Sequence, residues 1–104
     1  MERIWSGAHE FSEIRLLNAL RTGTIPFKAD EMTDAERLLG GAGPSIAARL
    51  GVPPTTPAIQ LVPVVQAALT KWKRRAENPL STRDVADAGR VLVRTCEGML
   101  VALR

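Results

Sequence analysis

The chain has 104 residues and a formal net charge of +3, and 45% of its residues are hydrophobic. This length predicts one domain over residues 1–104, with a core large enough to need no disulfide or structural metal. The single cysteine excludes an intramolecular disulfide and fits a reducing cytoplasm. Every apolar run falls short of the roughly 18 residues of a membrane span, so we expect a cytoplasmic protein without a membrane partner.

The first predicted helix spans residues 8–22. Ser6 is placed to act as its N-cap, and Gly23 supplies a stop at its end. Apolar residues recur along this segment with helical spacing. The positions that we expect to face inward are Phe11, Ile14, Leu17 and Leu20.

Two short helices are predicted next. Thr33 and Glu36 have the spacing of a capping box, which indicates a helix over residues 33–40. Pro44 favours the first position of another helix, over residues 44–50. Together these short segments make the N-terminal half of the chain rich in loops.

A proline-rich stretch at residues 53–57 separates this half from the C-terminal half. Each half alone is too small for an independent core, so we interpret the stretch as an internal hinge within one domain. Further along, Pro63 lacks the N–H that would bond to Ile59. It therefore predicts a kink or break in the chain at Val62 and Pro63.

Two long helices, over residues 63–77 and 81–103, are predicted to form an antiparallel hairpin because the link at residues 78–80 is short. Ser81 is expected to cap the second helix, and Leu80 to pack onto its first turn. The two apolar stripes that meet are Leu61, Val65, Ala68 and Trp72, and Val85, Ala88, Leu92, Cys96, Met99 and Leu103. The predicted fold class is all-α, with about five helices, the short ones N-terminal, closing with this long helical hairpin.

Two glycines, Gly89 and Gly98, lie inside the last predicted helix, on opposite sides of it. A glycine in a helix interior costs up to about 1 kcal/mol relative to alanine. We therefore expect at least one of them to allow a close contact with another part of the chain.

The end of the last helix is the first candidate site. Met99, Leu100, Val101 and Leu103 present apolar side chains around the whole helix, and one chain of this length covers only one stripe of it. We expect these residues to form an interface with a partner protein or with a second copy of the chain. The alternative is that the helix at residues 8–22 covers them within one chain.

A set of basic residues is the second candidate site. Its members are Lys71, Lys73, Arg74, Arg75, Arg83, Arg90 and Arg94. Such a set favours contact with the phosphates of a nucleic acid. The competing interpretation is that some of these cations oppose a helix dipole, while Asp87 and Glu97 pair with Arg90 and Arg94.

Residues 45–52, Ser-Ile-Ala-Ala-Arg-Leu-Gly-Val, resemble the first helix and turn of helix-turn-helix DNA-binding proteins. In such a turn, small residues like Ala47 and Gly51 let two helices approach closely. The resemblance implies a recognition helix in the remainder of residues 44–62. That remainder is rich in proline, and Gln60 is its one candidate for reading a base edge.

The sequence predicts no enzyme activity and no cofactor. Cys96 lies on an apolar stripe and far along the chain from His9, so they do not suggest a nucleophile and its base. His9 and Glu13, four residues apart, could share a metal ion, but the pattern lacks the other ligands. We therefore expect no catalytic residues and no metal site.

The function that the sequence favours is a non-catalytic, small helical interaction or regulatory module that self-associates, as a dimer, and binds a partner protein. The alternative is a DNA-binding transcriptional regulator, with a degenerate helix-turn-helix at residues 44–62 and basic phosphate contacts. DNA binding predicts retardation of duplex DNA that weakens steeply with salt, whereas the interaction module predicts none at physiological salt.

Overall fold

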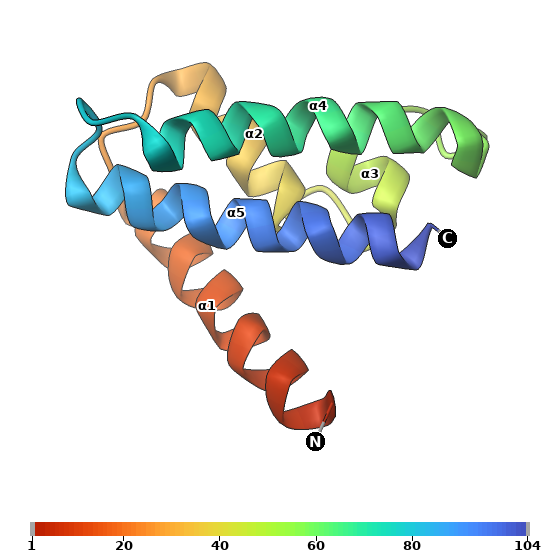
Figure 1. Ribbon diagram of the computed structural model, residues 1–104, viewed down its shortest axis with the longest axis horizontal. Helices are drawn as coiled ribbons and strands as arrows, with labels where there is room; N and C mark the ends of the chain where they lie inside the picture. The colour runs from red at the N-terminus through yellow and green to blue at the C-terminus, as the bar shows by residue number, and fades with distance from the viewer. Residues whose placement is uncertain (1, 104) are drawn as a thin grey trace.

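The computed structural model describes the backbone of residues 2–103 and the side chains of residues 9–103. Within this range the chain forms five helices and no strand, which confirms the all-helical prediction (Figure 1). The helices are α1 Glu2–Thr22, α2 Ala29–Leu38, α3 Ile46–Leu50, α4 Ala58–Glu77 and α5 Arg83–Ala102. None of them combines the length and the apolar character needed to cross a membrane.

Helices α4 and α5 lie side by side and antiparallel, as the predicted hairpin requires (Figure 1). Leu61, Val65 and Trp72 of α4 are buried. The predicted stripe of α5 is buried from Val85 through Met99. The two half-buried stripes therefore cover each other, as their helical spacing indicates.

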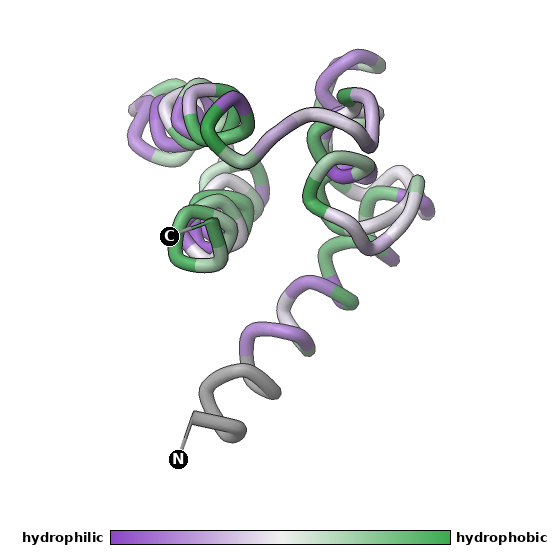
Figure 2. Tube along the Cα trace, turned by 90° about the vertical axis from the view of Figure 1, so that its right-hand side faces the viewer, coloured by the Kyte–Doolittle hydropathy of each residue, from purple (hydrophilic) through white to green (hydrophobic). Residues whose placement is uncertain are grey.

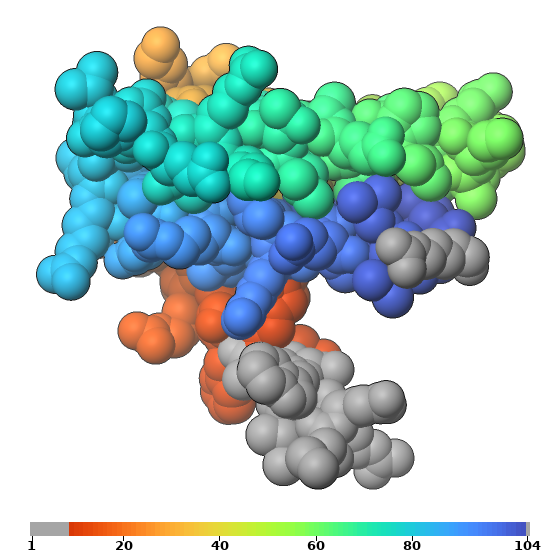
Figure 3. All heavy atoms as spheres, in the orientation of Figure 1, coloured from red at the N-terminus to blue at the C-terminus, as the bar shows by residue number. Residues whose placement is uncertain are grey.

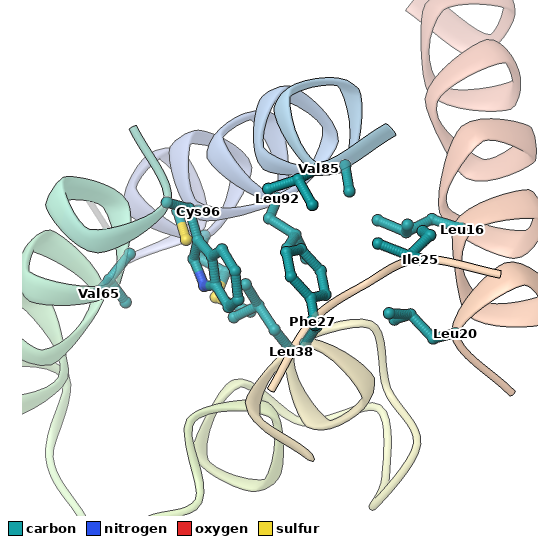
Figure 4. Close-up of a cluster of buried hydrophobic side chains, with 13 residues drawn as sticks. Leu16, Leu20, Ile25, Phe27, Leu38, Val65, Val85, Leu92 and Cys96 are labelled. Carbon is teal, nitrogen blue, oxygen red and sulfur yellow. The ribbon is translucent and has the colours of Figure 1, made fainter. Parts of the chain in front are cut away.

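The remaining helices complete the core from the other side of this hairpin. Figure 2 shows α4 and α5 on one side of the molecule and the shorter helices on the other. Phe27, in the α1–α2 connection, packs against Trp72 with a ring-centroid distance of 5.5 Å and the rings tilted by 53°. Leu38 of α2 and Ile25 join the same buried cluster (Figure 4). One continuous core thus connects four of the five helices.

The cap of α5 differs from the prediction. Thr82, and not Ser81, is the N-cap, and its Oγ1 accepts a bond from the backbone N–H of Val85 at 3.3 Å. Ser81 instead donates from its hydroxyl to the carbonyl oxygen of Arg75 at 2.8 Å, at the end of α4. Leu80 is 89% exposed, so it does not pack onto the first turn. Adjacent hydroxyl residues offer equivalent caps, and here the one nearer the turn binds the preceding helix.

Helix α2 begins at Ala29, four residues before the predicted capping box. Glu31 takes the box role, because its Oε1 accepts a bond from the backbone N–H of Lys28 at 3.2 Å. Thr33 lies within the helix and donates its hydroxyl to the carbonyl of Ala29 at 3.0 Å. The prediction of a start at Thr33 was wrong because a threonine can bond back to the preceding turn as well as cap the next one.

Helix α4 begins at Ala58 and runs through Pro63, so the predicted start at residue 63 and the break there were wrong. Pro63 is exposed, and the buried Leu61 and Val65 flank it on the core side. Packing on both sides of the proline keeps the helix continuous although one backbone bond is missing. The hinge at residues 53–57 stays a prediction.

Helix α1 begins at Glu2, so Ser6 lies inside it and is not its N-cap. The predicted stop at Gly23 is confirmed by a φ of 75°. Similarly, Gly51 ends α3 with a φ of 72°, whereas the N-cap of α3 is Ser45 rather than a residue before Pro44.

The buried face of α1 also differs from the prediction. Phe11 and Ile14 are 70% and 56% exposed, although both were expected to face inward. Leu20 is buried as predicted, and Leu16 joins it in the core. The N-terminal part of α1 extends away from the bundle (Figure 1), which leaves the side of the helix that carries Phe11 and Ile14 exposed.

Gly89 confirms the close contact expected at one of the two glycines of α5. A Cβ at Gly89 would lie 3.0 Å from the backbone nitrogen of Ala76 in α4, whereas a Cβ at Gly98 would meet nothing within 4 Å. We predict that Gly89→Ala lowers the free energy of unfolding by about 1–3 kcal/mol through overpacking. Gly98→Ala, the matched control, should raise it by up to about 1 kcal/mol. Urea denaturation measures both, and stabilisation by both substitutions would contradict the close packing.

Candidate functional site

The apolar end of α5 is partly covered by its own chain. Met99 is buried in the core, and Leu100 and Leu103 pack against that core while remaining partly exposed. Val101 is 66% exposed. Of the four residues predicted to form an interface, the exposed apolar surface is therefore a patch centred on Val101. Self-association through this patch stays a prediction. The alternative cover from α1 is not seen for Phe11 and Ile14, which are themselves exposed.

Two of the seven candidate phosphate contacts already bind carboxylates of α2. The Lys71 Nζ lies 2.7 Å from the Oδ2 of Asp34 and 4.8 Å from the ring centroid of Trp72. Arg75 pairs with Glu31, because its Nη2 donates to Oε1 at 3.0 Å and its Nε lies 2.9 Å from Oε2. These cations fasten α4 to α2, which makes them poor candidates for binding phosphate.

The other five basic residues lie on exposed surface. Arg90 pairs with Asp87, as its spacing predicts. The other four form no ion pair with the side chains of residues 9–103. They are Lys73, Arg74, Arg83 and Arg94. A hollow of about 420 Å³ between α4 and α5 brings Lys73, Arg90 and Arg94 together, but Glu77 and Glu97 line it too. The carboxylates offset most of the positive charge there.

The segment resembling a helix-turn-helix packs differently from what that resemblance implies. Its first helix, α3, has five residues, and Ala47 is buried. A Cβ at Gly51 would lie 2.6 Å from Nη1 of Arg37, so the close approach is to α2 and not to a recognition helix. Gln60 is exposed in the first turn of α4. These contacts favour a structural role for the glycine.

A polar cluster joins α1, α3 and α5, and the sequence patterns did not identify it. Thr95 is 3% exposed, and its hydroxyl lies 2.6 Å from the Oε2 of Glu13 and 3.2 Å from the Nε2 of His9. The Thr95 hydroxyl also lies 3.1 Å from the carbonyl oxygen of Val91, and the shortest of the three contacts assigns its single proton to Glu13, so His9 donates from Nε2. Arg49 of α3 places its Nη2 3.7 Å from the same Glu13 oxygen. We call these four residues the α1 cluster.

The α1 cluster lines a hollow of about 260 Å³ between the three helices. Arg49 also donates from its Nε to the carbonyl of Leu38 at 2.8 Å, which ties the end of α2 to the same place. Each residue of the cluster has a polar partner inside the protein, so the arrangement is suited to holding helices together. His9 and Glu13 do lie together as their spacing suggests, at 3.4 Å, but no group of three metal-binding side chains occurs in the described part of the chain.

The position of Thr95 in the sequence is unusual, and the sequence patterns considered above did not include it. It lies on the same face of α5 as Leu92 and Met99, where every neighbour is apolar. A buried hydroxyl needs a partner, because leaving it unpaired costs about 1–3 kcal/mol. The carbonyl of the preceding turn can supply that partner, as Val91 does at 3.1 Å, so a threonine on an apolar stripe is compatible with a polar contact from another helix but does not require one.

Comparison with known proteins gives a partial similarity. No protein-family model and no solved structure matches the chain. Two curated relatives, both called isoniazid-induced protein IniC, come from the CDC 1551 / Oshkosh and ATCC 25618 / H37Rv strains of Mycobacterium tuberculosis. Each is 33% identical over 100 residues, which cover 96% of this chain. The chain spans only 20% of the length of these relatives.

Thr95→Val tests the α1 cluster, because valine keeps the shape of threonine and removes its hydroxyl. We expect the free energy of unfolding to fall by about 1–3 kcal/mol, since the Glu13 carboxylate loses its donor in a partly buried place. Thr70→Val is the matched control: Thr95 lies 3.1 Å from the carbonyl oxygen four residues before it, at Val91, and Thr70 has the equivalent bond, to the carbonyl oxygen of Gln66 at 3.0 Å, but is exposed. It should change stability by less than about 0.5 kcal/mol. Equal effects in urea denaturation would show that Glu13 gains nothing from Thr95.

Cys96 provides a test of burial, since burial raises the pKa of its thiol from 9.0 to about 11. At pH 8 the folded protein should therefore contain about a hundredfold less thiolate than the unfolded chain and react correspondingly slowly with a disulfide reagent. The unfolded chain loses this proton first as the pH rises, so stability is unaffected below pH 9 and falls between pH 9 and about 11. Reaction rates measured with and without urea check this, and equal rates would mean an accessible thiol.

Proposed function

We propose that the chain is a non-catalytic helical interaction module that self-associates and binds a partner protein. The single observation that carries this proposal is the large apolar side chain of Val101, exposed beside the partly exposed Leu100 and Leu103 at the end of α5. Apolar surface of this kind marks protein–protein contacts when it forms a patch. Here three neighbouring residues, Leu100 and Val101 of α5 and its C-cap Leu103, supply the patch.

The distribution of charge favours this function over DNA binding. Lys71, Arg75 and Arg90 are engaged by carboxylates of the same chain. Affinity for DNA depends on the number of phosphates that free cations neutralise. The segment that resembles a helix-turn-helix adds little to it, since Gly51 packs against α2.

Val101→Asp is the test of the proposed patch. Wild-type protein at about 100 μM should scatter light as a dimer, and the variant should shift toward the monomer mass of 11.3 kDa because a buried, unpaired carboxylate opposes association. Leu80→Asp is the control, since Leu80 is exposed at the opposite end of the hairpin. A wild-type monomer mass, unchanged by Val101→Asp, would contradict self-association.

A further inference from the structure

A hollow lies between α1 and the first half of α5. It has a volume of about 540 Å³. Its floor is apolar, with Leu16, Ile25 and Ala88 buried and Val91 partly exposed. We call this hollow the α1–α5 groove. Figure 3 shows the two helices that form it, with α1 against the lower edge of α5.

The two walls of the groove carry opposite charges. Arg15 lies on the α1 wall, and Asp84 and Asp87 lie on the α5 wall. Asp87 is paired with Arg90. Neither Arg15 nor Asp84 has an ion-pair partner among the side chains of residues 9–103, and both are exposed.

An apolar ridge borders the same groove. Phe11 precedes Arg15 by one helical turn, so both project from the same side of α1. Ile14 lies beside them, and both apolar side chains are more than half exposed. The ridge and the apolar floor together form an apolar surface that one chain does not cover.

We propose that the α1–α5 groove is the docking site of a second copy of this chain, related by a two-fold axis that runs along the groove. Such an axis exchanges the two walls, so Arg15 of each copy faces Asp84 of the other. It also brings the ridge at Phe11 of one copy toward Val91 of the other. Because a two-fold axis repeats every contact, one Arg15 and one Asp84 in each chain are enough to make the interface self-complementary.

The charges argue for a second copy over a different partner. A groove with one basic and one acidic wall requires an occupant with the reverse arrangement, and a copy turned by the two-fold axis has it. This inference rests on the proposed self-association and adds to it a surface distinct from the end of α5, so the two surfaces are tested by separate variants.

A charge-reversal cycle tests the groove, with the dissociation constant measured by sedimentation of the full chain. Arg15→Asp and Asp84→Arg should each weaken the dimer by at least about tenfold, because each places like charges opposite one another twice. The double variant Arg15→Asp/Asp84→Arg should restore the wild-type constant to within roughly threefold. Arg83→Asp is the matched control, adjacent to Asp84 in sequence and outside the groove, and should leave the constant unchanged.

Urea denaturation of each variant separates interface effects from folding effects. Asp84 lies in the first turn of α5, where its negative charge interacts favourably with the helix dipole. Asp84→Asn, which removes this charge without reversing it, is therefore measured as well. It should weaken the dimer less than Asp84→Arg does. The proposed docking in the groove is wrong if both single reversals leave the dimer intact. It is also wrong if the double variant fails to restore the dimer.

The outcomes also separate this inference from the proposed function. A monomeric wild-type protein at about 100 μM overturns both. A dimer that Val101→Asp dissociates and the groove variants do not overturns the groove alone. A dimer that follows the charge-reversal cycle and ignores Val101→Asp supports the groove and removes self-association from the end of α5.

Discussion

The packing of α4 against α5 is the contact on which the other elements depend. Gly89 lets the two backbones approach at Ala76, and Trp72, Leu92 and Cys96 fill the space along the same line. Burial of these large side chains stabilises the hairpin by roughly 1.5–3 kcal/mol for each aliphatic one. The hairpin alone would leave one side of Trp72 bare, and Phe27 and its neighbours from the short helices cover it. The N-terminal half is therefore organised by what the hairpin leaves exposed.

The same dependence explains where sequence patterns succeed. The stripes of the two long helices were predicted because their spacing is regular and their burial is set by one partner. The caps were less predictable, since Ser81 and Thr82 both have the right chemistry, and the choice depends on the carbonyl of Arg75 in the preceding helix. Likewise, Pro63 interrupts only a backbone bond, while the packing of its neighbours holds the helix together. Long-range contacts decided each of these positions.

Helix α1 shows the limit of periodicity most clearly. Its apolar residues lie on more than one side, and spacing alone selected Phe11 and Ile14 as buried. The structure instead buries a face that includes Leu16 and Leu20 at one end and the polar pair His9 and Glu13 at the other. The local sequence pattern of a helix does not indicate that half of its contacts with the bundle are polar. The partner that makes such a face possible, Thr95, lies 82 residues from Glu13 and 86 residues from His9 along the chain.

This division of α1 has a consequence for function. Its C-terminal end is fixed by apolar burial, whereas its middle is fixed by hydrogen bonds and by the Arg49 ion pair. Hydrogen bonds of this kind contribute about 1 kcal/mol each but fix direction more closely than apolar contacts do. The α1 cluster thus sets the angle at which α1 leaves the bundle. Because α1 is also one wall of the α1–α5 groove, the width of that groove depends on the same angle. The polar contact at one level of α1 is therefore linked to the shape of the apolar surface at the next.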